Sequence, residues 1–446
     1  MLAAAVRGPD VPCRGYVRGM TIWADLGFSG NLYDSRPLQA NAEGDQLLLG
    51  RADSARRLLS QLQNSTLHPT LEGPNGVGKT SLVLVTTYRA VQARRAMTTT
   101  QTLLPIEKIL QFSNDPDRMM REALLAVAQS LISHERLLEQ CGHSVANLAA
   151  LKAWLNSPVL HGGGGGVGPV TAQISREANS SEGFLSSGLE ALVRSALTET
   201  FPTPESGSLV GVIDNVELVS RSNDARRVLE TLRDSALDLP GVRWVLCGAL
   251  GIIRSCVTSP RLDGRVAPPL EIAPVADDVV EDLINARIEF FRTRPDATAP
   301  VDAPSFRHLY DVCNKNLRDA LKYAQAFAVW LDVEGEASRP ENFASLLEVW
   351  LASEAENIVG AISLQDRAWR LFDELAQTGG SCAPSDNERF GFNTPQQMRT
   401  NFAALERVSL IKAEVDEDDL RRRTVNLTDK GWVVHYARTN FAAAGA

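Results

Sequence analysis

Short apolar runs alternate with longer helical segments through the first half of the chain. Leu209–Ile213 and Val242–Cys247 are runs of apolar residues of the length expected for buried strands. Ala55–Gln63 and Asp115–Ile132 instead place their apolar residues at helical spacing. Strands that alternate with helices predict an α/β fold, in which helices cover both faces of a mostly parallel sheet.

Strand-like apolar runs no longer alternate with the helical segments after residue 273. An acidic pair at the start of 277–291 can cap one helix, and Asn316 can cap a second helix over Leu317–Leu331. Glu341–Glu356 reads as a third helix. Because no strand-like run separates these segments, we expect a separate helical domain over 274–358.

The pattern changes again in the last 88 residues, 359–446. Helical patterns are predicted over Leu364–Gln377, over the short stretch Ser385–Phe390, and from Thr394-Pro395 onward, where Thr is a favourable N-cap and Pro a favourable first residue. Strand patterns at Leu410–Val415 and Arg422–Leu427 follow, and a closing helix begins at Thr428-Asp429. Three helices followed by a hairpin predict the winged form of the helix-turn-helix.

Composition narrows the class of protein. The chain has 446 residues, of which 44% are hydrophobic and 22% charged, as in ordinary globular proteins. No apolar run reaches the ~18 residues of a membrane span, and residues 1–19 lack the apolar core of a signal peptide. We therefore expect a cytoplasmic protein with no membrane partner. The net charge of −9 excludes a basic surface over the whole protein, so any DNA contact must be local.

One segment of the sequence matches a motif with a known chemical role. The eight residues from Gly73 to Thr80 match the phosphate-binding loop G-x-x-x-x-G-K-[ST], with a short strand before them and a helix after them. Glycines allow consecutive backbone N–H groups to converge on an anion, and the helix N-terminus adds to this attraction. The predicted ligands are ATP and Mg²⁺, and the predicted nucleotide-binding residues are Gly73, Pro74, Asn75, Gly76, Val77, Gly78, Lys79, Thr80 and Ser81.

Within this loop, Lys79 is expected to contact the β- and γ-phosphates, and the Thr80 hydroxyl to bind Mg²⁺. A second magnesium ligand is expected at the end of a neighbouring strand, and Asp214 closes the apolar run before it. Hydrolysis also needs a group that orients or deprotonates water. Many such ATPases carry Glu directly after the Asp, but here that position is Asn215. Glu217 is the nearest carboxylate and the favoured base; if it is instead an ordinary surface residue, hydrolysis should be slow.

Three arginines could act on the γ-phosphate. Arg318 opens a helix of the helical domain and could clamp the γ-phosphate, unless it pairs with Asp319 or Asp311. Arg261 and Arg265 lie between the last strand and the helical domain and could reach the nucleotide of a neighbouring subunit as an arginine finger. Solvated loop charge is the alternative for both.

Taken together, these motifs resemble the AAA+ and STAND groups of P-loop ATPases, especially the origin-recognition and transposition-regulator type. The resemblance covers the chain from about Leu48 and rests on Leu49-Gly50-Arg51, the phosphate loop, the segment 213–217, the Arg261/Arg265 loop, the segment 316–321 and the winged helix. It implies a homo-oligomer bridged by ATP, and action on DNA or as a signalling switch; similar ATPases occur in bacterial defence systems. Asn215 departs from the family pattern, as does the lack of a polar first-sensor residue at Cys247-Gly248.

The implied organisation is an N-terminal extension and linker (1–40), a P-loop ATPase core (41–273), a helical lid (274–358) and a winged-helix domain (359–446). Residues 393–400 and 421–423 offer side chains that can contact bases or phosphates. However, residues 361–446 contain 11 Lys or Arg and 12 Asp or Glu, a net charge of −1, which gives little general affinity for DNA. The alternatives for this module are therefore DNA binding and docking to a protein.

Other nucleotide-binding classes fit less well. The loop is also similar to that of ABC-type ATPases, and Leu185–Gly188 faintly resembles their signature, but no histidine lies between His161 and His308 to serve as their switch residue. The segment 314–317 begins like a guanine-reading motif, but Leu317 cannot accept the N–H groups of guanine. The alternative function for the whole chain is a DNA-binding regulator, in which ATP sets the conformation and is hydrolysed only slightly.

Overall fold

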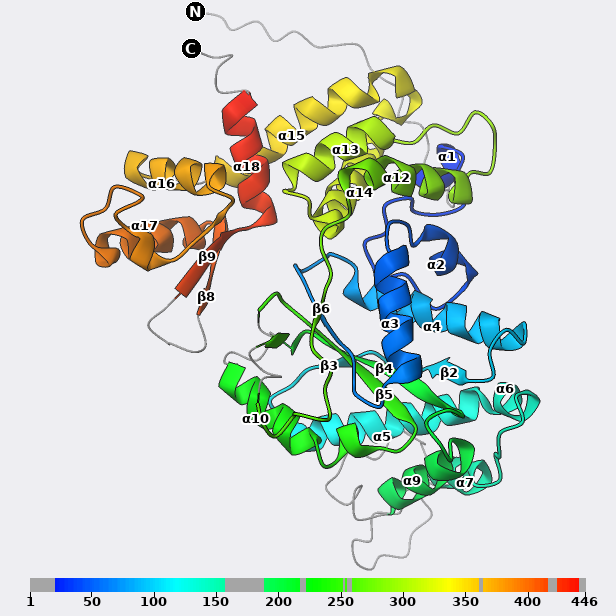
Figure 1. Cartoon of the computed structure of the whole chain (residues 1–446). Coiled ribbons are helices and arrows are strands. Elements are labelled where there is room, and N and C mark those ends of the chain that lie inside the picture. Colours follow the sequence, from blue (N-terminus) through cyan, green and yellow to red (C-terminus); the bar gives the residue numbers. More distant parts are fainter. Residues whose placement is uncertain are drawn as a thin grey trace, which may run out of the picture.

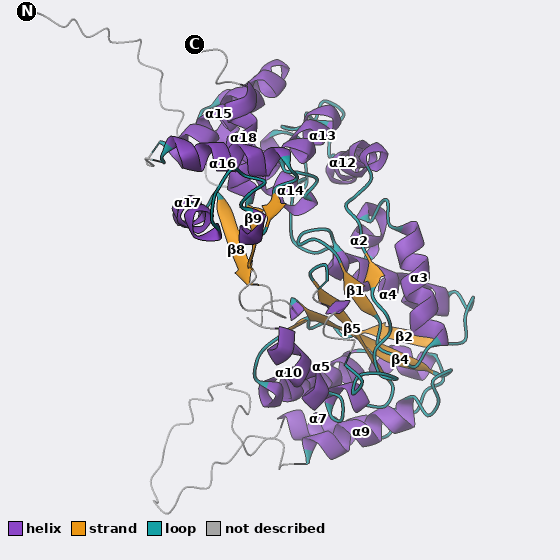
Figure 2. Ribbon diagram, turned by 60° about the vertical axis from the view of Figure 1, so that its left-hand side comes forward, coloured by secondary structure: helices purple, strands orange, loops and turns teal. Residues whose placement is uncertain are grey.

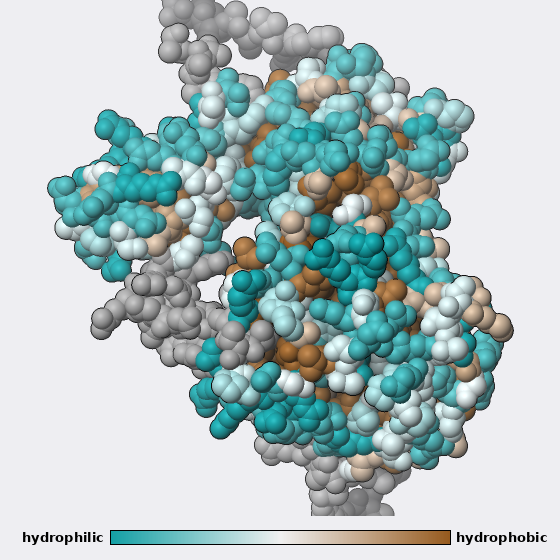
Figure 3. Space-filling model, in the orientation of Figure 1, coloured by the Kyte–Doolittle hydropathy of each residue, from teal (hydrophilic) through white to brown (hydrophobic). Residues whose placement is uncertain are grey.

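The computed structural model describes residues 21–156, 188–216, 222–251, 253–254, 259–360, 364–415 and 423–440. In these residues a parallel sheet with flanking helices forms one part of the molecule, and a helical region with a small antiparallel sheet forms the other (Figures 1 and 2). The face in Figure 3 is largely hydrophilic, with smaller hydrophobic areas.

The central sheet is parallel, as predicted. Its strands are β1 (Thr70–Glu72), β2 (Thr102–Pro105), β3 (Leu110–Gln111), β4 (Gly207–Asp214), β5 (Val242–Gly248) and β6 (Leu270–Glu271). They lie in the order β2-β4-β5-β1-β6, and β3 pairs with β4 beside β2. Every pairing is parallel. One strand, β5, thus separates the strand before the phosphate loop from the strand that ends at Asp214.

Alternate residues of the central strands are buried in different cores. On β5, Trp244 and Leu246 pack with the cluster that includes helices α5, α9 and α10, whereas Val245 and Cys247 pack with the cluster that includes α3 and α4. Burial on both faces explains why these strands read as continuous apolar runs. Gly211 of β4 allows this packing, because a Cβ there would lie 2.3 Å from the Trp244 ring.

The helices of the core cover both faces of the sheet (Figure 1). They are α2 (Ala42–Leu47), α3 (Ala52–Asn64), α4 (Lys79–Arg95), α5 (Pro116–Ser133), α6 (Glu135–Gln140), α7 (Leu148–Asn156), α9 (Leu189–Thr200), α10 (Ser222–Leu232) and the short 3-10 helix η2 (Ala236–Asp238). Asp115 caps α5 by accepting from the backbone N–H of Arg118 at 2.9 Å, and Pro116 begins that helix. These local signals are why the helix was readable from sequence.

The lid helices are α12 (Asp277–Phe291), α13 (Ala303–Val312), α14 (Leu317–Val333) and α15 (Phe343–Val359), with 3-10 turns η3 (Glu336–Ser338) and η4 (Pro340–Asn342) between the last two. The sequence pattern predicts α12, α14 and α15 but not α13, which is short and starts with Ala303-Pro304. Asn316 caps α14 as expected, its side chain accepting from the backbone N–H of Asp319.

The segment assigned to the extension and linker packs against the lid from residue 21 on. It begins with α1 (Ile22–Asp25), and its apolar side chains share a core with the lid helices. The buried Tyr33 hydroxyl donates to the Val301 carbonyl at 2.6 Å and accepts from the Val301 N–H at 2.8 Å. Its ring stacks on Phe306. Tyr33 therefore anchors this segment to the lid.

The C-terminal module combines helices with a small antiparallel sheet. Its elements are α16 (Asp366–Gln377), β7 (Ser381–Cys382), η5 (Pro384–Asp386), α17 (Pro395–Arg407), β8 (Ile411–Val415), β9 (Arg423–Leu427) and α18 (Asp429–Asn440). The strands form an antiparallel sheet in the order β7-β9-β8. The short helix expected over 385–390 is a single 3-10 turn, and β7 was not anticipated. In α17, Met398, Phe402 and Leu405 are buried, as expected.

Candidate functional site

The phosphate loop lies between β1 and α4, at the carboxyl edge of the sheet. Its turn contains two glycines with left-handed backbone, Gly76 (φ 79°) and Gly78 (φ 96°), and α4 begins directly at Lys79. The first turn of α4 therefore presents backbone N–H groups to the loop, which suits an anion. The predicted strand–loop–helix context of the motif is present.

The Lys79 ammonium bends back over the loop. Its Nζ donates to the carbonyl oxygens of Gly73 at 2.8 Å and Pro74 at 3.1 Å, and the residue is buried. A buried ammonium is stabilised when several acceptors surround it. These contacts hold the charge at the centre of the loop, where a phosphate chain would meet it.

Thr80 and Asp214 meet although they are 134 residues apart. The Thr80 hydroxyl donates to Asp214 Oδ2 at 2.6 Å. Hydroxyl and carboxylate oxygens are the hard donors that Mg²⁺ prefers, and Mg²⁺ typically takes one or two carboxylates with substrate phosphates and water. This donor pair fits the ion. Within the described residues, no cluster of three His, Cys, Asp or Glu offers a richer metal site.

Asn215 follows Asp214 in a left-handed backbone conformation, with φ 60°. Asn tolerates this region better than most residues. Its backbone N–H donates to Asp214 Oδ1 at 2.9 Å, and its side-chain Nδ2 donates to Gln111 Oε1 at 2.6 Å. Gln111 was missed from sequence, since only the pairing of β3 with β4 places it there. Glu217, the predicted base, lies outside the described residues.

Arg51 forms hydrogen bonds that hold the phosphate loop in place. This buried side chain donates from Nη2 to the Val77 carbonyl at 2.8 Å and from Nη1 to the Ala273 carbonyl at 2.7 Å. Burial lowers the pKa of its guanidinium from the ordinary value. Arg51 therefore joins the phosphate loop to the chain that leads into the lid.

The start of α14 packs directly on the phosphate loop. Asn316 Nδ2 donates to the Asn75 carbonyl at 3.3 Å. A Cβ on Gly76 would lie 2.5 Å from Asn316 Oδ1 and 2.7 Å from Arg318 Cβ, so the close approach depends on glycine. Arg318 lines the resulting pocket. Asp311, one alternative partner for Arg318, is engaged by Arg307 and Lys315.

A pocket extends from the phosphate loop between the core and the lid. It measures about 820 Å³ with the open solvent at its mouth included. Its lining combines the loop, Asp214 and Asn215 with apolar side chains that include Leu48, Val275 and Leu321. Apolar side chains in a pocket that also contains a phosphate site suit a flat nucleobase. The lining residues outside the predicted nucleotide-binding and catalytic residues are Ser35, Arg36, Pro37, Leu38, Leu47, Leu48, Leu49, Arg51, Val275, Leu283, Arg287, Leu317 and Leu321.

Arg287 organises the N-terminal wall of this pocket. It is buried on α12, and its Nη1 donates to the carbonyls of Leu32 at 3.0 Å and Asp34 at 3.1 Å. Burial lowers its pKa to about 10. Farther along the same segment, the Leu38 N–H donates to Ser81 Oγ at 3.0 Å. The segment therefore bridges the lid and the first turn of α4.

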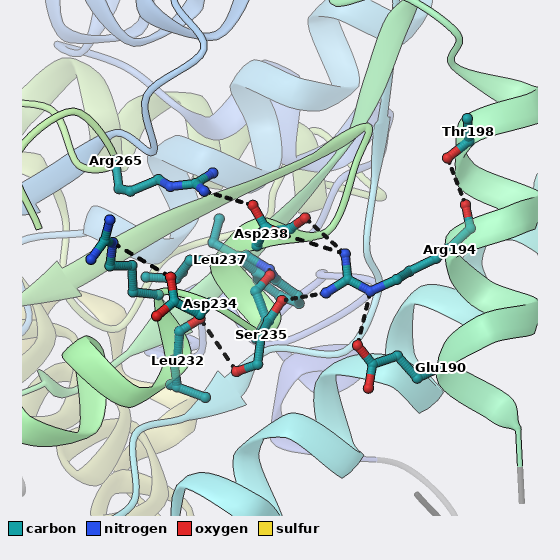
Figure 4. Close-up of polar contacts among 12 residues, drawn as sticks. Glu190, Arg194, Thr198, Leu232, Asp234, Ser235, Leu237, Asp238 and Arg265 are labelled. Atoms are coloured by element: carbon teal, nitrogen blue, oxygen red, sulfur yellow. Dashed lines mark hydrogen bonds and ion pairs between the residues drawn. The ribbon is translucent and has the colours of Figure 1, made fainter.

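Arg261 and Arg265 are both engaged within the chain. Arg265 Nη2 lies 2.7 Å from Asp238 Oδ1, and Arg194 reaches the other oxygen of the same carboxylate at 3.6 Å (Figure 4). Arg261 makes a longer ion pair of 3.4 Å with Glu230, and its side chain is 74% exposed. Arg261 is thus the less constrained of the two for reaching another subunit.

The side chains of the C-terminal module that were selected for DNA contact are partly described. Residues 393–397, 399 and 400 are exposed at the start of α17, with Thr394 capping the helix through the Gln397 N–H. Residues 421 and 422 lie outside the described residues, and the Arg423 side chain is likewise outside them. No helix in the described ranges combines the length and apolarity needed to cross a membrane.

Comparison with known proteins gives a likeness in architecture. No protein-family model matches the chain, and no curated protein matches it. The Aeropyrum pernix ORC1 protein in complex with DNA aligns over 94% of this chain and 99% of its own, at 15% identity and a TM-score of 0.46. The Aeropyrum pernix ORC2 protein with ADPNP and ADP aligns over 94% of this chain and 99% of its own, at 13% identity and a TM-score of 0.47. A Walker-type ATPase of Pyrococcus abyssi aligns over 91% of this chain and 99% of its own, at 13% identity and a TM-score of 0.44.

Two of these neighbours are named as ORC proteins and the third as a Walker-type ATPase. At such low identity the likeness transfers no residue role and no partner to this chain. The α/β P-loop class of the core follows independently from its own parallel sheet and loop geometry.

Proposed function

We propose that this protein is an ATPase that binds Mg²⁺–ATP, hydrolyses it slowly and works as a nucleotide-dependent switch. The observation that carries the proposal is the 2.6 Å contact between Thr80 and Asp214 beside the phosphate loop. This contact brings together two oxygen donors suited to Mg²⁺, next to the Lys79 ammonium and the N-terminus of α4.

Each part of the site has a distinct task in this proposal. The loop backbone and Lys79 hold the phosphates, while Thr80 and Asp214 would hold Mg²⁺, which neutralises phosphate charge when bound. The apolar side chains that line the pocket would pack against the base. Glu217 stays the sequence-based candidate for a general base. Asn215, which is no carboxylate, is the reason to expect slow turnover.

The lid supplies the switch. Arg318 lines the pocket at the start of α14, and the same helix turn packs on Gly76. A guanidinium that binds the γ-phosphate loses that partner after hydrolysis, which favours movement of the lid. In an oligomer, Arg261 is the favoured arginine finger because it is exposed and its ion pair is long. Arg265 is the second candidate.

A second function, ATP-gated DNA binding, is favoured by the exposed polar face at the start of α17. Neighbours in the structural comparison include an origin-recognition protein in complex with DNA. Electrophoretic shifts with duplex DNA at several salt concentrations test this function, with and without ATP. Absence of a shift at low salt would exclude it and leave docking to a protein as the role of the module.

The main proposal is tested by phosphate release under single-turnover conditions, together with light scattering in the presence of ATP or ADP. We expect slow release of phosphate that requires Mg²⁺, and larger particles with ATP than with ADP. Nucleotide binding without phosphate release would reduce the function to an ATP-bound switch, and no nucleotide binding would refute it.

A further inference from the structure

Asn215, the residue directly after Asp214, is held in place by a second amide side chain. Asn215 Nδ2 donates to Gln111 Oε1 at 2.6 Å, and both Asp214 and Asn215 line the pocket. The contact uses the nitrogen of the Asn215 side chain and leaves its oxygen as an acceptor.

The sheet itself does not require this contact. Strands β3 and β4 are already joined through the backbone, with Gln111 in register with Asp214 and the Phe112 N–H donating to the Asp214 carbonyl at 2.9 Å. The Asp214 carboxylate is engaged by Thr80 and by the Asn215 N–H. What the Gln111 contact adds is a fixed rotamer for Asn215.

We propose that Gln111 is a positioning residue that holds the Asn215 amide so that its oxygen orients the water attacking ATP. This inference rests on the proposed function. In the reaction, the water oxygen bonds to the γ-phosphorus as the bond from the γ-phosphorus to the β–γ bridging oxygen breaks, and ADP leaves with that electron pair. An amide cannot accept the proton of the water, so the proton passes to a γ-phosphate oxygen.

This arrangement gives a consistent account of slow turnover. Phosphoryl transfer depends mostly on positioning and electrostatic stabilisation, so an orienting group supports catalysis even when it is not a base. Among the described residues that line the pocket, Asp214 is the sole carboxylate, and it is committed to Thr80. Asn215 lies directly beside it and keeps its amide oxygen as an acceptor.

The test uses the full chain and three substitutions. Gln111→Leu removes the acceptor at similar size, and Gln111→Glu keeps an acceptor for Asn215 Nδ2. Gln101→Leu is the matched control. Gln101 directly precedes β2, at the amino end of the strands and away from Asp214, and its Nε2 donates to the Gln63 and Pro204 carbonyls. ATP affinity is measured by calorimetry, and turnover by single-turnover phosphate release.

We expect Gln111→Leu to lower the rate of phosphate release by about 10-fold and Asn215→Ala by about 100-fold, the scale of a misplaced reacting group. ATP affinity should stay within about twofold of wild type, since neither side chain holds the phosphates. Gln111→Glu should restore most of the rate, and Gln101→Leu should leave it unchanged.

A readout independent of turnover is the affinity for ADP with aluminium fluoride, which mimics the transferring phosphoryl group with the water in place. Gln111→Leu should weaken binding of this complex by about 10-fold and leave ADP binding unchanged. Equal effects on both ligands, unchanged phosphate release in Gln111→Leu, or no phosphate release by the wild type would each overturn the inference. Loss of ATP binding by the wild type would instead overturn the proposed function.

Discussion

The nucleotide pocket and the C-terminal module differ in how clearly their side chains indicate a ligand. In the pocket, the phosphate loop, Asp214, Arg51, the lid and the segment before α2 converge on one cavity. The C-terminal module has the expected helices and hairpin, but residues 361–446 have a net charge of −1. A fold can thus be recognised in both regions, whereas the ligand is specified in only one of them.

The C-terminal module also packs directly against the lid. The Tyr436 hydroxyl of α18 donates to Glu348 Oε2 of α15 at 2.6 Å and lies 3.0 Å from His308 Nε2 of α13. Lys322 of α14 lies 2.5 Å from Asp429 at the start of α18. The apolar side chains of lid and module belong to one continuous core. The lid and the module are therefore joined by side-chain contacts and by a shared core.

The largest expected effect belongs to the pocket. Lys79→Ala should weaken ATP binding by at least about 100-fold, because it removes the ammonium from the loop centre. Isothermal titration calorimetry measures this loss. Lys108→Ala is the control, since Lys108 forms a half-exposed ion pair with Glu122. Equal ATP affinity in Lys79→Ala and wild type would remove the proposed distinction between the two regions.

A smaller effect is expected where the lid meets the loop. Gly76→Ala should weaken ATP binding by about 10-fold, because its Cβ would push Asn316 and Arg318 off the loop. Gly142→Ala is the matched control: Gly142 has a similar φ of 83°, but nothing lies within 4 Å of its Cβ. Both variants carry the same backbone strain, so similar ATP affinities in the two would show that the lid contact does not matter.

The junction of lid and module should contribute to stability but not to ATP affinity. Tyr436→Phe should lower the free energy of unfolding by about 1 kcal/mol, as it removes the hydrogen bonds of the hydroxyl to the partly exposed Glu348 and His308. Thr439→Ala on the same helix should change it by less than about 0.5 kcal/mol, because its hydroxyl bonds to the His435 carbonyl within the exposed helix. Chemical denaturation checks both. A change in ATP affinity in Tyr436→Phe would mean that the module shapes the pocket directly.

The smallest effect is a pH dependence next to Arg318. Burial and the nearby Asp429 raise the pKa of Asp319 to about 6. A carboxyl whose folded pKa lies above its unfolded value of 3.8 destabilises the fold once pH exceeds that unfolded value, and the full penalty is reached above about 6. Asp319→Asn should therefore stabilise the protein by about 1 kcal/mol at pH 7, after allowance for solvent screening, and by nothing below about pH 4. A gain that is independent of pH would contradict this account.

The sequence revealed those parts of the molecule whose signals are local. The phosphate loop is contiguous because several backbone N–H groups must converge on one anion, and the buried strands β4 and β5 show as apolar runs because both of their faces are covered. Caps at Asp115, Asn316 and Thr394 likewise mark the starts of the helices that follow them directly.

The missed residues depend on contacts between distant segments. Gln111 matters because β3 pairs with β4, and Arg287 because its guanidinium meets carbonyls more than 250 residues away. The role of Tyr33 in the lid depends on Val301 in the same way. The pairing of Arg265 with Asp238 could not be read from the loop either. No periodicity or motif encodes such pairings before the fold is known.

The most direct test of the central claim is calorimetric titration of the full chain with ATP in excess Mg²⁺, alongside thermal unfolding of the same samples. The account predicts a measurable heat of binding and a higher unfolding temperature with ATP, both reduced when Mg²⁺ is chelated. No heat and no thermal shift at millimolar ATP would contradict it.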